Sequence, residues 1–223
     1  MDPIIAATHA DPYPYYAQLR AEGGLVFHQR LKLWMASSAR AVAAVLAHPD
    51  CHVRPSHEPV PRLIAQSIAG KVFGQLMRMN EGERQRFAAT SLIRNTQLDS
   101  AQVDDLIAEV QRFDPSVQNT RRFVAAPCEI DGVSLNHGDV ILVLLASANR
   151  DPQLNDDPDA FLLDRPNRRS FTFGAGRHQC PGQVLALHIA SSTLTKILAM
   201  KPALERLTWH YRPSLNGRIP LFA

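Results

Sequence analysis

The residues best suited to chemistry lie in one short stretch, FGAGRHQCPG at 173–182. It places Cys180, one of only three cysteines in the chain, among glycines and basic residues, directly before a proline and an apolar run. A buried structural thiol does not need such surroundings. A metal-ligating thiolate does, because cysteine binds metals in its deprotonated form and the start of a helix favours negative charge. The stretch therefore indicates a thiolate metal ligand at Cys180.

The other residues of this loop fit the needs of one metal group, a haem. Haem carries two anionic propionates, for which Arg177 and His178 are candidate basic partners, and Phe173 is expected to pack on the proximal face of the ring. A flat macrocycle that passes close to the main chain also requires positions without side chains. Three glycines of the loop are expected to provide them, namely Gly174, Gly176 and Gly182.

The spacing Phe-Gly-x-Gly-x-His-x-Cys-x-Gly resembles the haem-binding loop of the cytochrome P450 family in its bacterial form. The resemblance continues in EVQRF at 109–113, which is similar to the Glu-x-x-Arg helix of that family through Glu109 and Arg112. Residues 129–161 and 164–174 are similar to the family's sheet, meander and approach to the cysteine loop. Residues 11–50 look like its first helix, first hairpin and second helix.

The resemblance implies a truncated cytochrome P450-like fold, mainly α with a smaller β part (α+β), in a single haem-thiolate domain over 1–223. Residues 1–113 are expected to be mostly helical with an N-terminal hairpin. Residues 114–223 are expected to hold the sheet, the meander, the cysteine loop and a C-terminal helix. Periodicity and capping signals predict helices at 11–23, 38–50, 62–79, 81–98, 99–113 and 181–200, and hairpins at 25–37 and in the last residues. Asp99 or Ser100 is expected to cap the helix over 99–113.

The same resemblance implies heme b as the cofactor, with Cys180 as the axial iron ligand. Arg122, in preference to its neighbour Arg121, is implied as a propionate partner, and Arg84 as a further one. Glu109 and Arg112 are implied as a structural pair that holds the meander. The family usually has a third arginine where this chain has Ala160, and Arg165 is the candidate substitute.

The chain departs from the family between the first half and Glu109, where only residues 88–108 stand in place of a long helical stretch. The family's central helix, which crosses the distal haem face and carries an acidic residue next to a threonine, has no counterpart in this chain. Thr96 and Asp99 are the candidates for that pair, but they occur in the wrong order. The family usually has a second basic propionate partner at the position of Ala88, and alanine cannot take that role. An uncovered apolar ring is costly in water. We expect the apolar helix over 62–79, or the second copy in a homodimer, to cover it.

Three functional hypotheses remain open at this point. The first is a haem-thiolate oxidoreductase of monooxygenase or peroxygenase type that acts on a small organic molecule, with electrons from a ferredoxin-type donor or with peroxide, and with no catalytic residue beyond the haem iron. The second keeps the haem but catalyses a rearrangement, dehydration or isomerisation. The third is a degenerate, non-catalytic haem-binding or interaction protein.

Composition sets the remaining limits. The net charge is +3, from 24 basic and 21 acidic residues, which predicts neither a nucleic-acid partner nor a membrane surface. No apolar run approaches the roughly 18 residues of a membrane span. The three cysteines, Cys51, Cys128 and Cys180, are widely spaced and odd in number, which favours a reducing, cytoplasmic setting over a disulfide framework.

Overall fold

A computed structural model describes residues 1–55, 98–200 and 208–222 of the chain. The helix predicted over 62–79 and all but the last residue of the one predicted over 81–98 lie outside these ranges, as do Arg84, Ala88 and Thr96. The first described range holds α1 (Pro3–Ala6), α2 (Tyr13–Glu22), β1 (Leu25–His28), β2 (Leu33–Ala36), α3 (Ala39–Ala47) and β3 (Cys51–His52). The predictions for 11–23, 25–37 and 38–50 are therefore confirmed, and α1 is an additional helix.

The remaining described residues alternate between helices, strands and long connections. They hold α7 (Ser100–Phe113), β4 (Thr120–Val124), β5 (Cys128–Ile130), β6 (Val133–Leu135), β7 (Val140–Val143), α8 (Leu145–Asn149), the 3-10 turn η1 (Gly176–His178), α9 (Gln183–Ala199), β8 (Trp209–Arg212) and β9 (Ile219–Phe222). This content agrees with the expected α+β fold class. The division of the chain into a single domain stays a prediction.

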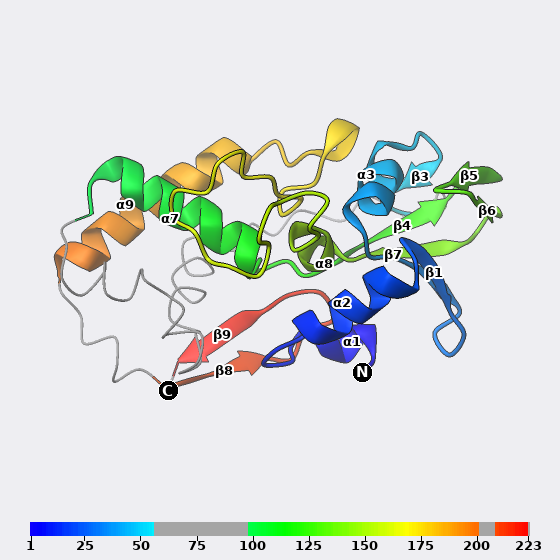
Figure 1. Cartoon of the computed structure of the whole chain (residues 1–223), viewed down its shortest axis with the longest axis horizontal. Coiled ribbons are helices and arrows are strands. Elements are labelled where there is room, and N and C mark those ends of the chain that lie inside the picture. Colours follow the sequence, from blue (N-terminus) through cyan, green and yellow to red (C-terminus); the bar gives the residue numbers. More distant parts are fainter. Residues whose placement is uncertain (56–97, 201–207, 223) are drawn as a thin grey trace.

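The main sheet joins the two halves of the chain. Its five strands lie in the order β1-β2-β7-β4-β3, and β2 pairs in parallel with β7. The N-terminal hairpin of β1 and β2 is thus continuous with strands from the second half, which the sequence had assigned to separate parts (Figure 1). Two small hairpins, β5–β6 and β8–β9, stand apart from this sheet.

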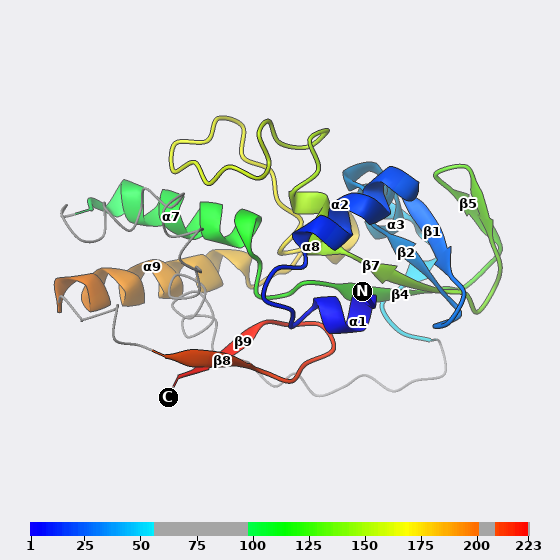
Figure 2. The ribbon, with the colours of Figure 1, turned by 60° about the horizontal axis from the view of Figure 1, so that its bottom comes forward.

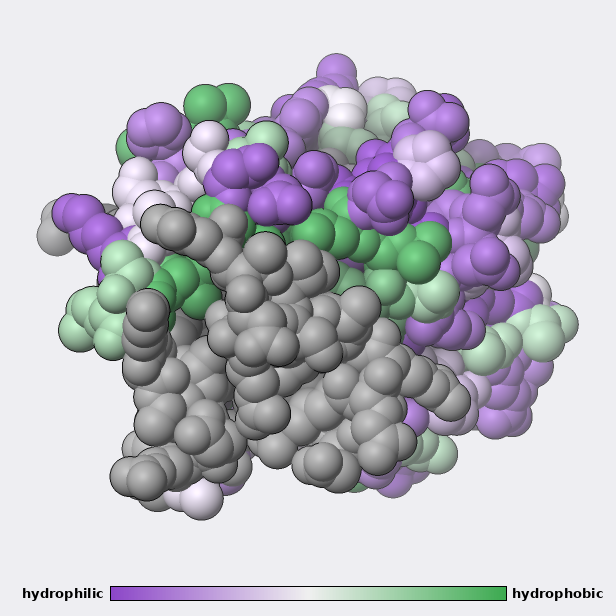
Figure 3. Space-filling view, turned by 60° about the vertical axis from the view of Figure 1, so that its left-hand side comes forward, coloured by the Kyte–Doolittle hydropathy of each residue, from purple (hydrophilic) through white to green (hydrophobic). Residues whose placement is uncertain are grey.

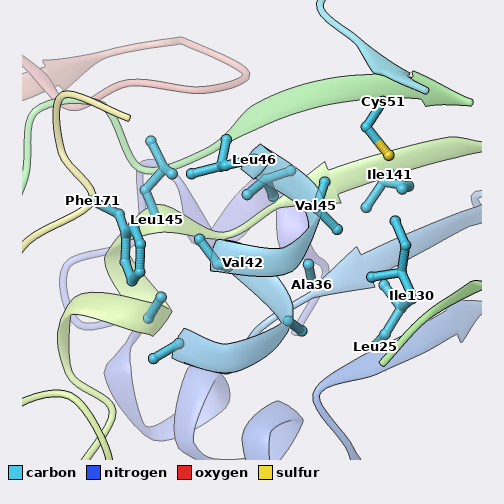
Figure 4. Close-up of a cluster of buried hydrophobic side chains, with 14 of the residues drawn as sticks. Leu25, Ala36, Val42, Val45, Leu46, Cys51, Ile130, Ile141, Leu145 and Phe171 are labelled. Atoms are coloured by element: carbon cyan, nitrogen blue, oxygen red, sulfur yellow. The ribbon is translucent and has the colours of Figure 1, made fainter. Parts of the chain in front are cut away.

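A buried apolar cluster fills the space between α3 and the sheet (Figure 4). The Ser38 side chain accepts a hydrogen bond from the Ala41 N–H and so caps α3. The next turns place Val42, Val45 and Leu46 in the cluster, where each is fully buried. The end of α3 then leads directly into the edge strand β3.

A second apolar cluster lies between α7 and α9, which run side by side in both ribbon views (Figure 2). Asp99 and Gln102 form a reciprocal capping box at the start of α7, which confirms Asp99 rather than Ser100 as the cap. The helix predicted from Pro181 begins at Gln183, with Gly182 as its N-cap. Residues 181–182 form a turn instead, so the cysteine stands three residues before the helix.

No helix within the described ranges combines the length and the apolar character that a membrane crossing requires.

Candidate functional site

The cysteine loop is closed by its own backbone. The Cys180 N–H donates to the Phe173 carbonyl at 2.8 Å, and the Gly174 N–H donates to the Phe171 carbonyl at 2.8 Å. Cys180 is a free, partly exposed cysteine, and the Gln183 N–H donates to its carbonyl at 3.2 Å. The Cys180 thiol therefore lies on a loop of fixed conformation, just before the start of α9.

Side-chain bonds fix the start of this loop to two helices. The Thr172 hydroxyl donates to the Gln111 carbonyl of α7 at 2.6 Å and accepts from the Asn149 side chain of α8 at 3.0 Å. The Asn149 amide oxygen accepts the Phe171 N–H at 2.7 Å. Each of these groups is buried, so the bonds stabilise one position of the loop.

Two glycines of the loop are required by the loop itself. Gly174 has φ +73°, and a Cβ there would lie 2.9 Å from the His178 carbonyl oxygen; Gly176 has φ +60°. Both values belong to the left-handed region that favours glycine. A Cβ at Gly182 would lie 3.8 Å from the Cys180 sulfur, which is ordinary contact, so the loop itself does not require a glycine at this position. Room for a macrocycle stays a prediction.

Arg122 is a buried cation that has no anionic partner among the residues that the structure describes. Its side chain is 4 % exposed, its Nη1 donates to the Arg121 carbonyl at 2.7 Å and to the Thr120 hydroxyl at 3.3 Å, and its buried Nε has no acceptor. Burial lowers its pKa, and the only opposing effect comes from the Cys51 thiol. Arg121 is exposed. A buried guanidinium of this kind favours binding of an external carboxylate or phosphate.

Other basic groups lie beside Arg122. Burial, followed by the charges of Arg122, Arg177 and His52, lowers the pKa of His178. These residues come from β4, from the cysteine loop and from β3, and no carboxylate of the described residues contributes to that shift. Sequence reasoning found Arg122, Arg177 and His178 but missed the charge of His52, which has no motif of its own and lies on the neighbouring strand β3.

Apolar surface continues from the thiol along α9. Val184 and Leu185, in the first turn of the helix, are 80 % and 66 % exposed, and Ile189 follows one turn later at 45 %. Figure 3 shows hydrophobic surface in green on the side of the molecule that lies at the left of Figure 1, where α7 and α9 run. A thiol, a cationic group and exposed apolar surface together are suited to a flat, largely apolar ligand that carries carboxylates and a metal.

The structure also holds a buried ionic cluster, with Glu109 at its centre. Its two carboxylate oxygens accept Arg112 Nη2 at 2.8 Å and Arg112 Nε at 3.0 Å, Arg165 Nε at 3.0 Å, and Arg168 Nε at 3.0 Å. Arg112 and Arg165 also donate to the Ala160 carbonyl. Burial raises the pKa of Glu109, but the bonds from these arginines outweigh it and leave the pKa lowered.

The cluster brings together Glu109, Arg112 and Arg165 as the sequence indicated, and their structural role stays a prediction. Arg168 is a fourth member that sequence reasoning missed. The basic run RPNRRS at 165–170 was the available signal for a further arginine, but it does not tell which arginine turns inward to Glu109. Phe173 is half-buried in the loop.

Residues 101–200 match the family model described as Cytochrome P450. The chain is 37 % identical over 122 residues to "Putative cytochrome P450 133B2" of Xylella fastidiosa, a match that covers 52 % of this chain and 30 % of that protein. It is 39 % identical over 102 residues to "20-oxo-5-O-mycaminosyltylactone 23-monooxygenase" of Streptomyces fradiae, which covers 46 % of this chain and 24 % of that protein.

Among solved structures, the fold is similar to the haem domain of a P450 from Tepidiphilus thermophilus, with a TM-score of 0.73 and 14 % sequence identity. That alignment covers 100 % of this chain and 95 % of that chain. At this identity the likeness shows the fold alone. The chain spans less than a third of the length of the curated relatives described above.

Proposed function

We propose that the chain, whose residues 101–200 match the Cytochrome P450 family model, is a member of that family, binds heme b through the Cys180 thiolate and acts as a haem-thiolate oxidoreductase of monooxygenase or peroxygenase type. The observation that carries the proposal is Arg122, which lies beside the closed loop of Cys180, is buried and has no anionic partner among the described residues. Its substrate would be a small organic molecule, and its electrons would come from a ferredoxin-type protein or be replaced by peroxide.

The described residues fit this cofactor in three respects. Cys180 offers a partly exposed sulfur on a loop whose backbone hydrogen bonds fix its position. Arg122 offers a cationic group, and His178 offers an imidazole N–H, for the carboxylates of the propionates. Val184 and Leu185 offer exposed apolar surface that a porphyrin would remove from water, at roughly 25 cal/mol for each Å².

Each part of the site has its own task in the proposed reaction. Bound haem supplies the redox chemistry on oxygen or peroxide. The Cys180 sulfur supplies negative charge to the metal, and the two tight glycine turns of the loop hold that sulfur in place. The charge of Arg122 and a hydrogen bond from His178 would hold the carboxylates of the cofactor, and the apolar residues of α9 would exclude water from one side.

A second candidate keeps the same site but not the oxygen chemistry. Asp99, the acidic residue near Thr96, accepts the Gln102 N–H at 2.8 Å as the cap of α7. That role removes it as a proton donor to oxygen. A rearrangement, dehydration or isomerisation needs no external electrons, so turnover of a test substrate without reductant or peroxide would favour this candidate.

The ligand assignment is tested by the spectrum of the purified, haem-loaded protein. We expect the reduced protein with carbon monoxide to show the absorption band that is diagnostic of a thiolate ligand, and Cys180→Ser to lose it because a hydroxyl does not replace a thiolate. Cys128→Ser is the matched control, since Cys128 is also a free, half-buried cysteine, and it should keep the band. A band that survives in Cys180→Ser would refute the proposal.

A further inference from the structure

Two of the three cysteines lie on strands that border the apolar cluster between α3 and the main sheet. Cys51, in the edge strand β3, is fully buried in this cluster, with its sulfur turned inward (Figure 4). Cys128 stands in β5, where successive side chains alternate between faces, so it shares a face with Ile130, a buried member of the same cluster. Helix α3 packs against both strands. The two cysteines therefore reach one apolar space from different strands.

The backbone brings these two segments together. β3 pairs antiparallel with β4, and beyond the paired residues the Ala125 N–H donates to the Asp50 carbonyl at 2.8 Å. Asp50 is the neighbour of Cys51, and Ala125 precedes Cys128 by three residues. The two thiols are hydrogen-bonded to each other. Both are free cysteines, so their side chains meet without a covalent bond.

We propose that Cys51 and Cys128 form a reversible disulfide when the protein meets hydrogen peroxide. This modification site goes beyond the proposed function, and it requires neither the haem nor Cys180. A disulfide forms only between cysteines that lie close together with their side chains directed at each other, and two hydrogen-bonded thiols meet that requirement. The new bond would join the β5–β6 hairpin, which stands apart from the main sheet, to the edge strand of that sheet.

The two thiols differ in exposure and in acidity, which sets the order of the steps. Cys128 is half-buried, whereas Cys51 is fully buried. Burial, followed by the neighbouring Cys128, raises the pKa of Cys51 to about 12. Burial, followed by the charges of Asp50 and Asp139, raises the pKa of Cys128, but the hydrogen bond from Cys51 opposes this shift. Cys128 is therefore the thiol that peroxide oxidises first, since the thiolate is the reactive form.

The reaction balances in two steps. The Cys128 thiolate attacks one oxygen of hydrogen peroxide, the O–O bond breaks, and a sulfenic acid and hydroxide form. The Cys51 sulfur then attacks the sulfenic sulfur, the S–O bond breaks, and the Cys51 proton leaves with the hydroxyl group as water. The two thiols together lose two electrons, which the peroxide gains. The charge of Arg122, which opposes the effect of burial on the pKa of Cys51, assists the second step.

Peptide mapping of the purified protein tests the proposal. The reduced protein is treated with hydrogen peroxide, its remaining thiols are blocked, and disulfide-linked peptides of the monomer are identified by mass spectrometry. We expect the peptides of Cys51 and Cys128 to be linked, and dithiothreitol to separate them. Cys180→Ser is the matched control, because it removes the third cysteine, and its two remaining thiols should both be lost on oxidation. A treated wild type without this link, or with Cys128 linked to Cys180 instead, would overturn the proposal.

Single substitutions separate the roles of the two thiols. Cys51→Ala should form no linked pair, and its Cys128 should stay as a sulfenic acid that a 1,3-dione reagent captures. Cys128→Ser should keep Cys51 reduced, because burial shields that thiol from peroxide. Capture of Cys51 as a sulfenic acid in Cys128→Ser would overturn the order of the steps. If Cys51→Ala does not fold, the maps of wild type and Cys180→Ser decide the proposal. The mapping needs no haem, so its outcome is independent of the spectrum that tests the proposed function.

Discussion

At the residue scale, Glu109 shows that a single carboxylate can bind several arginines. It is fully buried, and its two oxygens are shared by Arg112 of the same helix and by Arg165 and Arg168 of one distant segment. Arg165 lies 56 residues away in sequence and Arg168 lies 59 residues away. A buried ion pair contributes little when compared with a well-packed apolar core, but removal of one partner leaves the other charge uncompensated.

We predict that Glu109→Gln lowers the free energy of unfolding by about 3–5 kcal/mol at pH 7, because Arg112 and Arg165 would keep their charge without a counter-ion. The folded protein holds the pKa of Glu109 below its ordinary value of 4.5. The charge therefore contributes stability above pH ~4.5, and that contribution is lost as the pH falls through the lower pKa of the folded state. Urea unfolding measured across the acidic range should show a weaker dependence on pH in the variant.

Asp105 provides the matched control for this prediction. It bonds the same Arg168 at 3.0 Å, but its side chain is 52 % exposed. Solvent screens such a pair, so Asp105→Asn should change the free energy of unfolding by less than about 1 kcal/mol. Similar losses in the two variants would mean that burial of Glu109 does not determine its contribution.

At the scale of the element, α7 shows how a local signal positions part of the site. It carries Glu109 and Arg112 on its buried side and packs against α9, the helix that follows Cys180. Its start is defined by four residues, because Asp99 and Gln102 satisfy each other's backbone N–H groups. A helix that begins at another residue would present a different face to the meander.

We predict that Asp99→Ala lowers the free energy of unfolding by about 1 kcal/mol, the usual cost of losing an N-cap. Thermal unfolding followed by circular dichroism measures it. Ser100→Ala, one residue later at an exposed position of α7, should change stability by less than about 0.5 kcal/mol. A larger loss of stability in Ser100→Ala than in Asp99→Ala would show that Asp99 is not the N-cap of α7.

At the scale of the whole molecule, the parallel pairing of β2 with β7 connects residues that are about half the chain apart. Trp34 stands opposite Ile141, and its indole N–H donates to the Asp139 carboxylate at 3.3 Å. Ile141 is fully buried in the cluster below α3. The N-terminal hairpin therefore depends on the second half of the chain for its place in the sheet.

We predict that Ile141→Ala lowers the free energy of unfolding by about 2–5 kcal/mol. In a Trp209→Phe background, Trp34 is the only tryptophan, so its fluorescence follows the N-terminal half. The fluorescence and circular dichroism transitions should move together, because one sheet holds both halves. Leu215→Ala, at a side chain that is 58 % exposed, is the control and should stay within about 0.5 kcal/mol of wild type. A fluorescence transition that stays in place would contradict this dependence.

The sequence by itself determined the features that depend on residues close together along the chain. The caps at Ser38 and Asp99 involve partners three residues away, so their pattern is visible in the letters. The tight turns at Gly174 and Gly176 and the position of Cys180 belong to one stretch of ten residues for the same reason. The fold class followed from these signals and from the resemblance that they carry.

Only the tertiary structure decided which distant segments meet. Arg168 could not be told from Arg169 as the arginine that turns inward to Glu109. The packing of η1 against α3 and the pairing of β3 with β4 also join segments that are far apart in the chain. Such contacts are selected by the burial of the whole core and by the pairing of distant strands, and neither leaves a periodic or spaced signal in the sequence.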